Sequence, residues 1–310
     1  MKVLVIGATG FIGNAVAIAF SNAGHDTYGQ SRTSACEALL RRDEIFPLIG
    51  PPDEIAKHYA PGMDVIIDAC RPGLFGVNTT AIYDAVLAAC ESRSPQHKLT
   101  YIFVSGTWTH GTPALYDPLM SISERAPLGV DQTPLIAWRA DFETRVFGAA
   151  TNEAIKGGAA INPIVVRPSL LYGRSGSVLA ALFDQAYKGG HITWPGVPGV
   201  SRYNTIHQDD LARLILIIAE KAPIFSGLAI DAVNPQTESA EDVVRSLIRV
   251  AGGNLTYSFR EPENDLERAL CIPTHYSASL AYTLGGWTPR KPGLVDGMKR
   301  YYESFKGFQE

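Results

Sequence analysis

The chain has 310 residues, of which 46% are hydrophobic, and its 27 basic and 31 acidic residues give a formal net charge of −4. A chain of this length can bury a large core, either as one domain or as a main domain with a smaller one attached. The weak negative charge, with no basic run longer than Arg41-Arg42, excludes the electrostatic signature of proteins that bind nucleic acid or anionic membranes, and a small-molecule substrate is the expected partner.

The first half of the sequence alternates short apolar runs with longer helical patterns. The expected elements are, in chain order, strand 3–6, helix 14–23, strand 64–69, helix 79–91, strand 99–105, helix 135–153 and strand 164–167. Runs such as VLVI and DVIIDA are apolar on both faces, as parallel strands covered by helices on both sides must be. This alternation predicts an α/β fold with a doubly wound parallel sheet.

The segment KVLVIGATGFIGNAVAIAFSNAG places three glycines between the first strand and the first helix. Gly7 permits a tight turn, Gly10 lets a pyrophosphate approach the backbone, and Gly13 lets the helix pack closely on the strand. In this strand–turn–helix context the loop predicts dinucleotide binding. The residues expected to contact the cofactor here and at the ends of later strands are Gly7, Thr9, Gly10, Phe11, Ile12, Gly13, Ala69 and Pro168.

The second strand is expected to end near Gly29, where a carboxylate would hold the ribose hydroxyls of NAD. The chain has none there and reads Gln30, Ser31, Arg32. A hydroxyl and a guanidinium suit the 2′-phosphate of NADP, because arginine binds phosphate with two parallel hydrogen bonds. Ser31 and Arg32 therefore predict NADP(H) in preference to NAD(H), with a solvated surface arginine as the alternative for Arg32.

The second half of the chain has a different composition. Glycine, proline and aromatic residues are frequent in 173–203 and again in 262–292, which favours a smaller lobe over the sheet. Ser239 followed by Asp242 predicts the start of a helix after a strand at 228–232. The expected division is a dinucleotide-binding domain over 1–172 with 204–234 returning to it, and a smaller C-terminal α/β substrate lobe over 173–203 and 235–310.

Four cysteines, at positions 36, 70, 90 and 271, form no CxxC pair. This spacing predicts reduced thiols, with neither a metal site nor a disulfide framework. No apolar run reaches the 18 residues of a membrane-spanning helix, and the N-terminal segment leads directly into an apolar strand and a glycine turn. A cytoplasmic location is expected.

Four motifs follow one another along the chain: GATGFIG at 7–13, SERAPL at 123–128, VVRPSLLYG at 165–173 and NTIHQDDLA at 204–212. They resemble the cofactor loop, the TE-x-x-P-L segment, the RPxxVYG segment and the IHVDDLA stretch of the extended short-chain dehydrogenase/reductases, in their epimerase/dehydratase-like branch. The resemblance covers nearly the whole chain. It implies a Rossmann fold, a nicotinamide cofactor and enzymatic activity on a small molecule.

The same resemblance shows where this chain departs from the family's usual active site, which has a Tyr-x-x-x-Lys pair and a Ser or Thr after the fifth strand. In that site the tyrosine exchanges a proton with the substrate oxygen and the lysine binds the nicotinamide ribose. In register with SERAPL and Glu143, these two positions are Leu135 and Arg139, and FVSGTWTHG puts Gly106 at the hydroxyl position. The chain resembles an atypical member that lacks the Tyr-x-x-x-Lys pair.

Three side chains are candidates for the chemistry. Arg139 is expected to bind the cofactor ribose and to stabilise an oxyanion, although a guanidinium stays protonated and is a poor proton donor. Thr107 is expected to orient a carbonyl oxygen, and His110, at the tyrosine position of VYG, belongs to the residue type that titrates near neutrality. The alternatives are a helix-surface arginine paired with Glu143, a threonine that only ends a strand, and a histidine that faces solvent.

Aromatic residues on the segments expected to line the substrate cleft are Trp108, Trp138, Tyr172 and Tyr203. They predict an apolar or aromatic substrate, with core packing between the lobes as the alternative. Nucleotide-sugar enzymes of this branch use an arginine just before the IHVDDLA stretch. Here Arg202 is displaced by one residue, which disfavours such a substrate.

Three functions remain open. The first is an NADP-dependent oxidoreductase that transfers a hydride to or from a small carbonyl or hydroxyl compound, with Arg139 and Thr107 supporting the oxyanion. The second is a redox-neutral isomerase, epimerase or dehydratase, and the third is a non-enzymatic NADP-binding regulator that resembles the nitrogen-metabolite repression proteins. The aromatic substrate lobe favours an enzyme, and family analogy implies a homodimer through helices 79–91 and 135–153.

Overall fold

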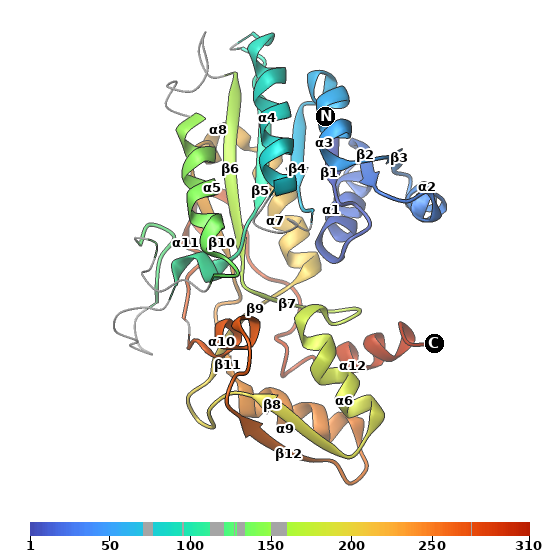
Figure 1. The fold of residues 1–310 in the computed structure, drawn as a ribbon, viewed down its shortest axis with the longest axis vertical. Helices are drawn as coiled ribbons and strands as arrows, with labels where there is room; N and C mark the ends of the chain where they lie inside the picture. The colour runs from blue at the N-terminus through green and yellow to red at the C-terminus, as the bar shows by residue number, and fades with distance from the viewer. Residues whose placement is uncertain are drawn as a thin grey trace.

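The computed structural model describes residues 1–70, 77–94, 96–111, 121–126, 128, 134–149, 160–273 and 275–310. They form two lobes, a larger one around a central sheet and a smaller one drawn below it in Figure 1. The chain passes between the lobes several times, so each lobe contains segments that are far apart in sequence.

The larger lobe is built on a seven-stranded sheet with the order β10-β6-β5-β4-β1-β2-β3. Its strands are β1 (Lys2–Ile6), β2 (Asp26–Ser31), β3 (Phe46–Ile49), β4 (Val65–Asp68), β5 (Leu99–Val104), β6 (Ile161–Pro168) and β10 (Ala229–Ala232). All neighbours are parallel, which confirms the predicted doubly wound sheet. The sequence prediction missed β3, which contains Pro47 and lies at the edge of the sheet, where a strand tolerates proline.

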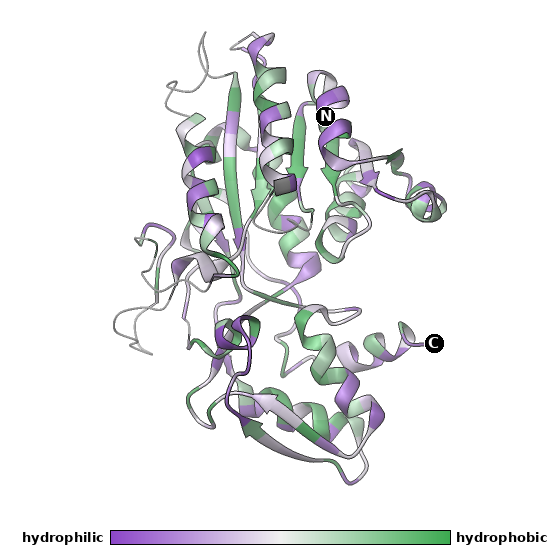
Figure 2. Cartoon of the chain, viewed as in Figure 1, coloured by the Kyte–Doolittle hydropathy of each residue, from purple (hydrophilic) through white to green (hydrophobic). Residues whose placement is uncertain are grey.

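Helices cover both faces of this sheet. Those on one face are α3 (Pro52–Tyr59), α4 (Val77–Glu91) and α5 (Ala137–Gly148), and those on the other are α1 (Phe11–Asn22), α7 (Gln208–Glu220) and α11 (Ser279–Gly285). Alternate residues of β1 serve the two faces, because Leu4 packs with the first group and Val3 with the second. The central strands are therefore mainly hydrophobic, as their green colour in Figure 2 shows.

The smaller lobe has its own apolar core. A parallel pair of strands, β8 (His191–Pro195) and β12 (Thr256–Arg260), packs with α6 (Ala180–Lys188), α9 (Ala240–Ala251), α10 (Asp265–Cys271) and α12 (Met298–Gly307). A three-stranded sheet of β7 (Leu170–Tyr172), β9 (Arg202–His207) and β11 (Thr237–Ser239) joins the lobes. The remaining short helices are α2 (Glu37–Arg42), α8 (Ala222–Phe225), η1 (Ser34–Cys36), η2 (Ala60–Gly62), η4 (Thr107–His110) and η6 (Ser177–Leu179).

A side-chain cap marks the start of α9. The Ser239 hydroxyl accepts a hydrogen bond from the Asp242 N–H, as the sequence predicted. The helix expected over 135–153 starts two residues later, at Ala137, and ends at Gly148, while 150–153 lie outside the described residues. Within the described part of the chain, no helix has both the length and the apolar character that crossing a membrane requires.

Gly13 sets how closely α1 approaches β1, and its replacement tests this packing. A Cβ atom at Gly13 would lie 2.1 Å from the backbone oxygen of Gly7, a contact that only a backbone shift relieves. We expect Gly13→Ala to lower the free energy of unfolding by about 3 kcal/mol. Gly62→Ala is the control, since its Cβ would meet nothing within 4 Å. Urea denaturation of both variants measures the difference, and equal stabilities would contradict the close approach.

His207 caps α7 only in its neutral form, because its Nδ1 accepts a hydrogen bond from the Asp209 N–H at 3.1 Å. Burial lowers the pKa of His207 to about 4, whereas the ordinary value is about 6.5. The folded state thus binds fewer protons than the unfolded state between these values, and stability falls as the pH drops from about 6.5 toward 4, by about 3 kcal/mol in total.

His207→Asn provides the control for this pH dependence, because asparagine keeps a side-chain acceptor at the helix start and does not titrate. Thermal melts of the wild type and the variant, recorded about one pH unit apart between pH 7 and pH 4, give the slope of stability against pH for each protein. A wild-type slope as shallow as that of His207→Asn would show that the buried ring does not control acid stability.

Candidate active site

The dinucleotide loop has the geometry that an anion-binding turn needs. Gly7 has a φ of +77°, and a Cβ atom there would lie 2.9 Å from the Cα of Cys70, so both conformation and space require glycine. Gly10 is the N-cap of α1 and provides no side-chain cap, and the first turn of the helix has no acidic residue. The helix N-terminus is therefore left with free N–H groups that suit a pyrophosphate.

The end of β2 carries the residues from which NADP was predicted. Arg32 is exposed and lines the large cavity described below. The Ser31 hydroxyl is buried and donates to the Thr33 carbonyl. Gln30 folds back to the loop, where its Oε1 accepts from the Gly7 N–H at 3.0 Å and its Nε2 donates to Gly50. Of this trio, Arg32 is the side chain presented to a ligand.

A cavity of about 780 Å³ runs along the carboxyl ends of the strands to the smaller lobe. The sequence-predicted site residues that line it are Ile12, Arg32, Thr107, Trp108, Trp138, Arg139 and Pro168. Sequence reasoning did not assign several further lining residues to a ligand, among them Asn78, Ser105, Gly106, Leu171, Val178 and Leu266. Leu266 comes from α10, so both lobes contribute to the wall.

Arg139 faces this cavity from the first turn of α5. Its Nε is buried without a hydrogen-bond partner, and its guanidinium carbon lies 5.4 Å from the centre of the Trp138 ring. Burial lowers the pKa of Arg139, while the negative charges of Glu143 and Asp68 act in the opposite direction. The surface pairing of Arg139 with Glu143, the alternative considered from the sequence, is wrong because Glu143 is fully buried and bonded elsewhere.

The Glu143 carboxylate is the centre of a buried polar cluster that the sequence analysis did not find. Its Oε1 accepts from the Ser105 hydroxyl at 2.5 Å, and its Oε2 accepts from Arg167 Nε at 2.9 Å and Nη2 at 2.5 Å. Arg167 belongs to the VVRPSLLYG motif and Ser105 follows β5. The sequence did carry a signal for this cluster: Arg167 lies within a family motif, and Glu143, of opposite charge, lies in register with another.

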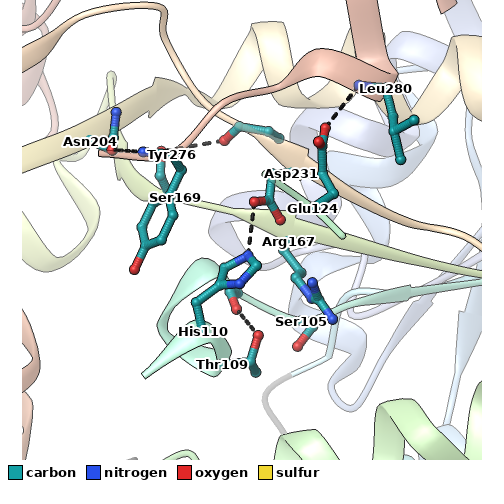
Figure 3. A network of polar contacts seen from close by, with 12 residues as sticks. Ser105, Thr109, His110, Glu124, Arg167, Ser169, Asn204, Asp231, Tyr276 and Leu280 are labelled. Atoms are coloured by element: carbon teal, nitrogen blue, oxygen red, sulfur yellow. Dashed lines mark hydrogen bonds and ion pairs between the residues drawn. The ribbon is translucent and has the colours of Figure 1, made fainter. Parts of the chain in front are cut away.

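His110 lies outside the cavity lining. Its Nε2 is 2.9 Å from Oδ2 of Asp231, its ring stacks on that of Tyr276 with centroids 5.1 Å apart, and 3% of the residue is exposed. Figure 3 shows this pair beside Thr109, Arg167 and Glu124. The sequence alternative of a solvent-facing histidine is wrong, and the predicted catalytic role finds no support in this position, since the ring is buried and His110 is not among the residues that line the cavity.

Tyr172 and Tyr203 also lie away from the cavity, in the core of the smaller lobe. The Tyr172 hydroxyl donates to the Pro292 carbonyl, and the Tyr203 hydroxyl accepts from the Trp194 indole N–H at 3.0 Å. Their predicted contact with substrate is corrected to core packing, because both hydroxyls are bonded within the protein. Arg202 is likewise held by Thr237, through its hydroxyl and its carbonyl.

Solved structures of epimerases and dehydratases resemble this chain over its whole length. The structure of dTDP-glucose 4,6-dehydratase from Bacillus anthracis in complex with NAD has a TM-score of 0.79 at 15% sequence identity and covers 99% of this chain and 97% of that chain. UDP-glucuronic acid 4-epimerase from Bacillus cereus in complex with UDP-glucuronic acid and NAD has a TM-score of 0.78 at 20% identity and covers 99% and 100%. At these identities the likeness establishes the fold.

No curated protein sequence matches the chain. A model of the NAD dependent epimerase/dehydratase family matches residues 3–226, which include the glycine loop, α5 and most of the strands of the large sheet. The chain therefore belongs to the NAD dependent epimerase/dehydratase family.

Proposed function

We propose that the chain is an NADP-dependent oxidoreductase that transfers a hydride to or from the carbonyl or hydroxyl carbon of a small apolar or aromatic compound. The observation that carries this proposal is the place of Arg139, whose guanidinium lines the cavity and makes no hydrogen bond or ion pair with the other described residues. Arg139 is half-buried and its Nε is fully buried, and a cation withdrawn from water without an acceptor is costly unless a ligand uses it. Ribose hydroxyls and a substrate oxygen are acceptors of the right kind.

NADP(H) is the cofactor that the residues favour. The free N–H groups of the α1 N-terminus suit the pyrophosphate, and the cavity-facing Arg32 suits a 2′-phosphate. The dehydratase and epimerase structures named above contain NAD, and NAD(H) is therefore the alternative cofactor for this chain. When bound, the nicotinamide would supply or accept the hydride.

The chain's own residues have distinct tasks in this proposal. Arg139 holds ribose hydroxyls and stabilises negative charge on the substrate oxygen, and the Thr107 hydroxyl orients that oxygen. Trp108, Trp138 and Leu266 form apolar walls that exclude water and favour an apolar or aromatic substrate. A nucleotide-sugar substrate is disfavoured, because Arg202 is bonded to Thr237 and is not free for a diphosphate.

A redox-neutral reaction is the second candidate, because the family and its solved structures include epimerases and dehydratases. The two candidates differ in whether NADPH is consumed. Mixing the purified protein with NADPH and a panel of aliphatic and aromatic aldehydes and ketones distinguishes them by the loss of NADPH absorbance. Cofactor binding in a thermal melt without consumption for any compound would overturn the oxidoreductase proposal and favour the redox-neutral one.

Replacing Arg32 tests the choice of cofactor. We expect Arg32→Ala to weaken NADPH binding about tenfold or more and to leave NADH binding unchanged, because only NADPH carries the 2′-phosphate that the guanidinium would bind. Fluorescence titrations with both cofactors measure the two dissociation constants. Arg42→Ala removes an exposed arginine from nearby α2 and is the matched control. Equal losses for NADPH and NADH, or for both variants, would contradict the assignment.

Replacing Arg139 tests the place of this side chain in the site. We expect Arg139→Met to weaken NADPH binding about tenfold or more and to abolish turnover, because an apolar side chain of similar length cannot hydrogen-bond ribose hydroxyls. Arg145→Met on the same helix removes a partly exposed arginine that pairs with Asp84, and it should leave both properties intact. Wild-type binding and turnover in Arg139→Met would contradict the assignment of this side chain to the cofactor and substrate.

A further inference from the structure

Gly106 is a glycine that its backbone does not require. Its φ of −179° and ψ of 151° are extended, a conformation open to any residue. It follows β5 and lines the cavity at the position where the family resemblance placed a hydroxyl side chain. The reason for glycine must therefore be sought in the space around it.

The Arg139 guanidinium borders that space. A Cβ atom at Gly106 would lie 3.4 Å from Nη1 of Arg139 and 3.8 Å from the Pro168 carbonyl oxygen, and apart from residues 105 and 107 no other described residue comes within 4 Å. A distance of 3.4 Å is an ordinary van der Waals contact, so a single methyl group fits at 106, whereas a larger side chain would extend into the guanidinium and displace it. The missing side chain at position 106 thus leaves room for the long side chain at position 139.

Among the described residues, no carboxylate is hydrogen-bonded to the Arg139 guanidinium that reaches this space. The two carboxylates whose charges act on it are engaged elsewhere, since Glu143 bonds Ser105 and Arg167, and Asp68 accepts from the Tyr101 hydroxyl and the Cys70 N–H. Among the described residues that line the cavity, Arg32 and Arg139 are cations and no side chain is acidic. The cavity beside Gly106 is therefore suited to negative charge.

We propose that Gly106 and Arg139 form a matched pair, in which the missing side chain at 106 lets Nη1 of Arg139 bind the anionic oxygen of an apolar ligand while the rest of the guanidinium remains free for the cofactor ribose. One side chain then supplies both of the donors that the resemblance assigns to a lysine and a hydroxyl. A guanidinium can do this because its donors form a planar fork that reaches two acceptors at once, whereas an ammonium group is a single point. This inference rests on the proposed cofactor site.

The apolar surroundings determine which anions fit. Leu135 and Trp138 line the cavity close to Arg139 in sequence, Trp108 lines it from η4, and Leu171 and Val178 line it from the segment that follows β6. A compound with an aromatic or aliphatic body and a single carboxylate or oxyanion matches these walls and the one cation beside Gly106. Benzoate is a suitable probe, and benzyl alcohol is its uncharged counterpart.

The test titrates benzoate into the NADPH-loaded protein and detects binding by saturation-transfer NMR, with NADPH affinity measured separately by fluorescence. We expect the wild type to bind benzoate in preference to benzyl alcohol. Arg139→Lys should keep NADPH affinity within about threefold and weaken benzoate binding about tenfold or more, because an ammonium group does not extend beside Gly106. Gly106→Val should weaken benzoate binding to a similar degree by displacing Nη1.

A double variant distinguishes an effect of Gly106 that acts through Arg139 from a direct clash between the introduced valine side chain and the ligand. If Gly106 acts only by making room for Arg139, then Gly106→Val in the Arg139→Met background costs nothing further, whereas a direct clash makes the two losses add. Gly106→Ala, whose methyl group moves Nη1 only slightly, should give a smaller loss in the same direction and serves if the valine variant does not fold.

The outcomes separate this inference from the proposed function. Additive losses, benzoate binding to Arg139→Lys as to the wild type, or no preference for benzoate over benzyl alcohol would each overturn the matched pair. Failure of the wild type to bind either NADPH or NADH would instead overturn the cofactor proposal. In that case the same benzoate titrations on the unloaded protein still decide whether Gly106 and Arg139 act together.

Discussion

The buried Glu143 carboxylate is the interaction on which the geometry of the site depends. It bonds Ser105 after β5 and Arg167 on β6, and thereby joins α5 to the carboxyl ends of two neighbouring strands. A buried ion pair adds little net stability, but removal of one partner costs about 3–5 kcal/mol, because the other charge is left unpaired. Arg139 stands one helical turn before Glu143, so the same anchor holds its guanidinium over the cavity.

This arrangement gives the two cations near α5 different tasks. Arg167 is neutralised by Glu143 and is part of the scaffold, whereas Arg139 has no hydrogen-bonded carboxylate among the described residues. Burial raises the pKa of Asp68, whose two oxygens accept from the Cys70 N–H and the Tyr101 hydroxyl. A second buried pair, His110 with Asp231, links the turn after β5 to β10. Structural pairs thus flank Arg139, which with Arg32 is one of two cations among the described residues that line the cavity.

The sequence predicted the sheet and the cofactor loop well because their signals are local. The apolar strands near the chain start and the Gly7, Gly10 and Gly13 spacing follow from the period of a strand and the turn between strand and helix. The roles of Tyr172, Tyr203 and His110 could not be predicted in this way, because a loop aromatic looks the same whether it faces a cleft or a core. Their partners Pro292, Trp194 and Asp231 are distant in sequence or on another strand and come close only through the fold.

The family register was more informative at Arg139 than composition or periodicity. On a helix with a mixed pattern, an arginine beside a tryptophan is compatible with a solvated face. Comparison with the position of the family's lysine predicted a buried guanidinium, and the structure places Nε in the protein interior at the cavity. The same register aligned Gly106 with a hydroxyl but could not show that Nη1 of Arg139 lies beside Gly106, since that depends on side-chain length and on the angle at which α5 meets β5.

The three departures from the usual active site are therefore best understood as one coordinated change. Leucine at 135 removes the tyrosine's acidic hydroxyl, glycine at 106 removes a second hydroxyl, and arginine at 139 adds a larger and permanently charged donor. A guanidinium stabilises a negative oxygen but does not release its own proton. Among the described lining residues, Arg32 and Arg139 are the only side chains with an ionisable charge, so the proton that a reduced product needs has to reach the oxygen by another route. Thr107 lines the cavity but is itself buried, so the reaction proposed above relies on electrostatic stabilisation by Arg139 more than on proton donation by a lining side chain.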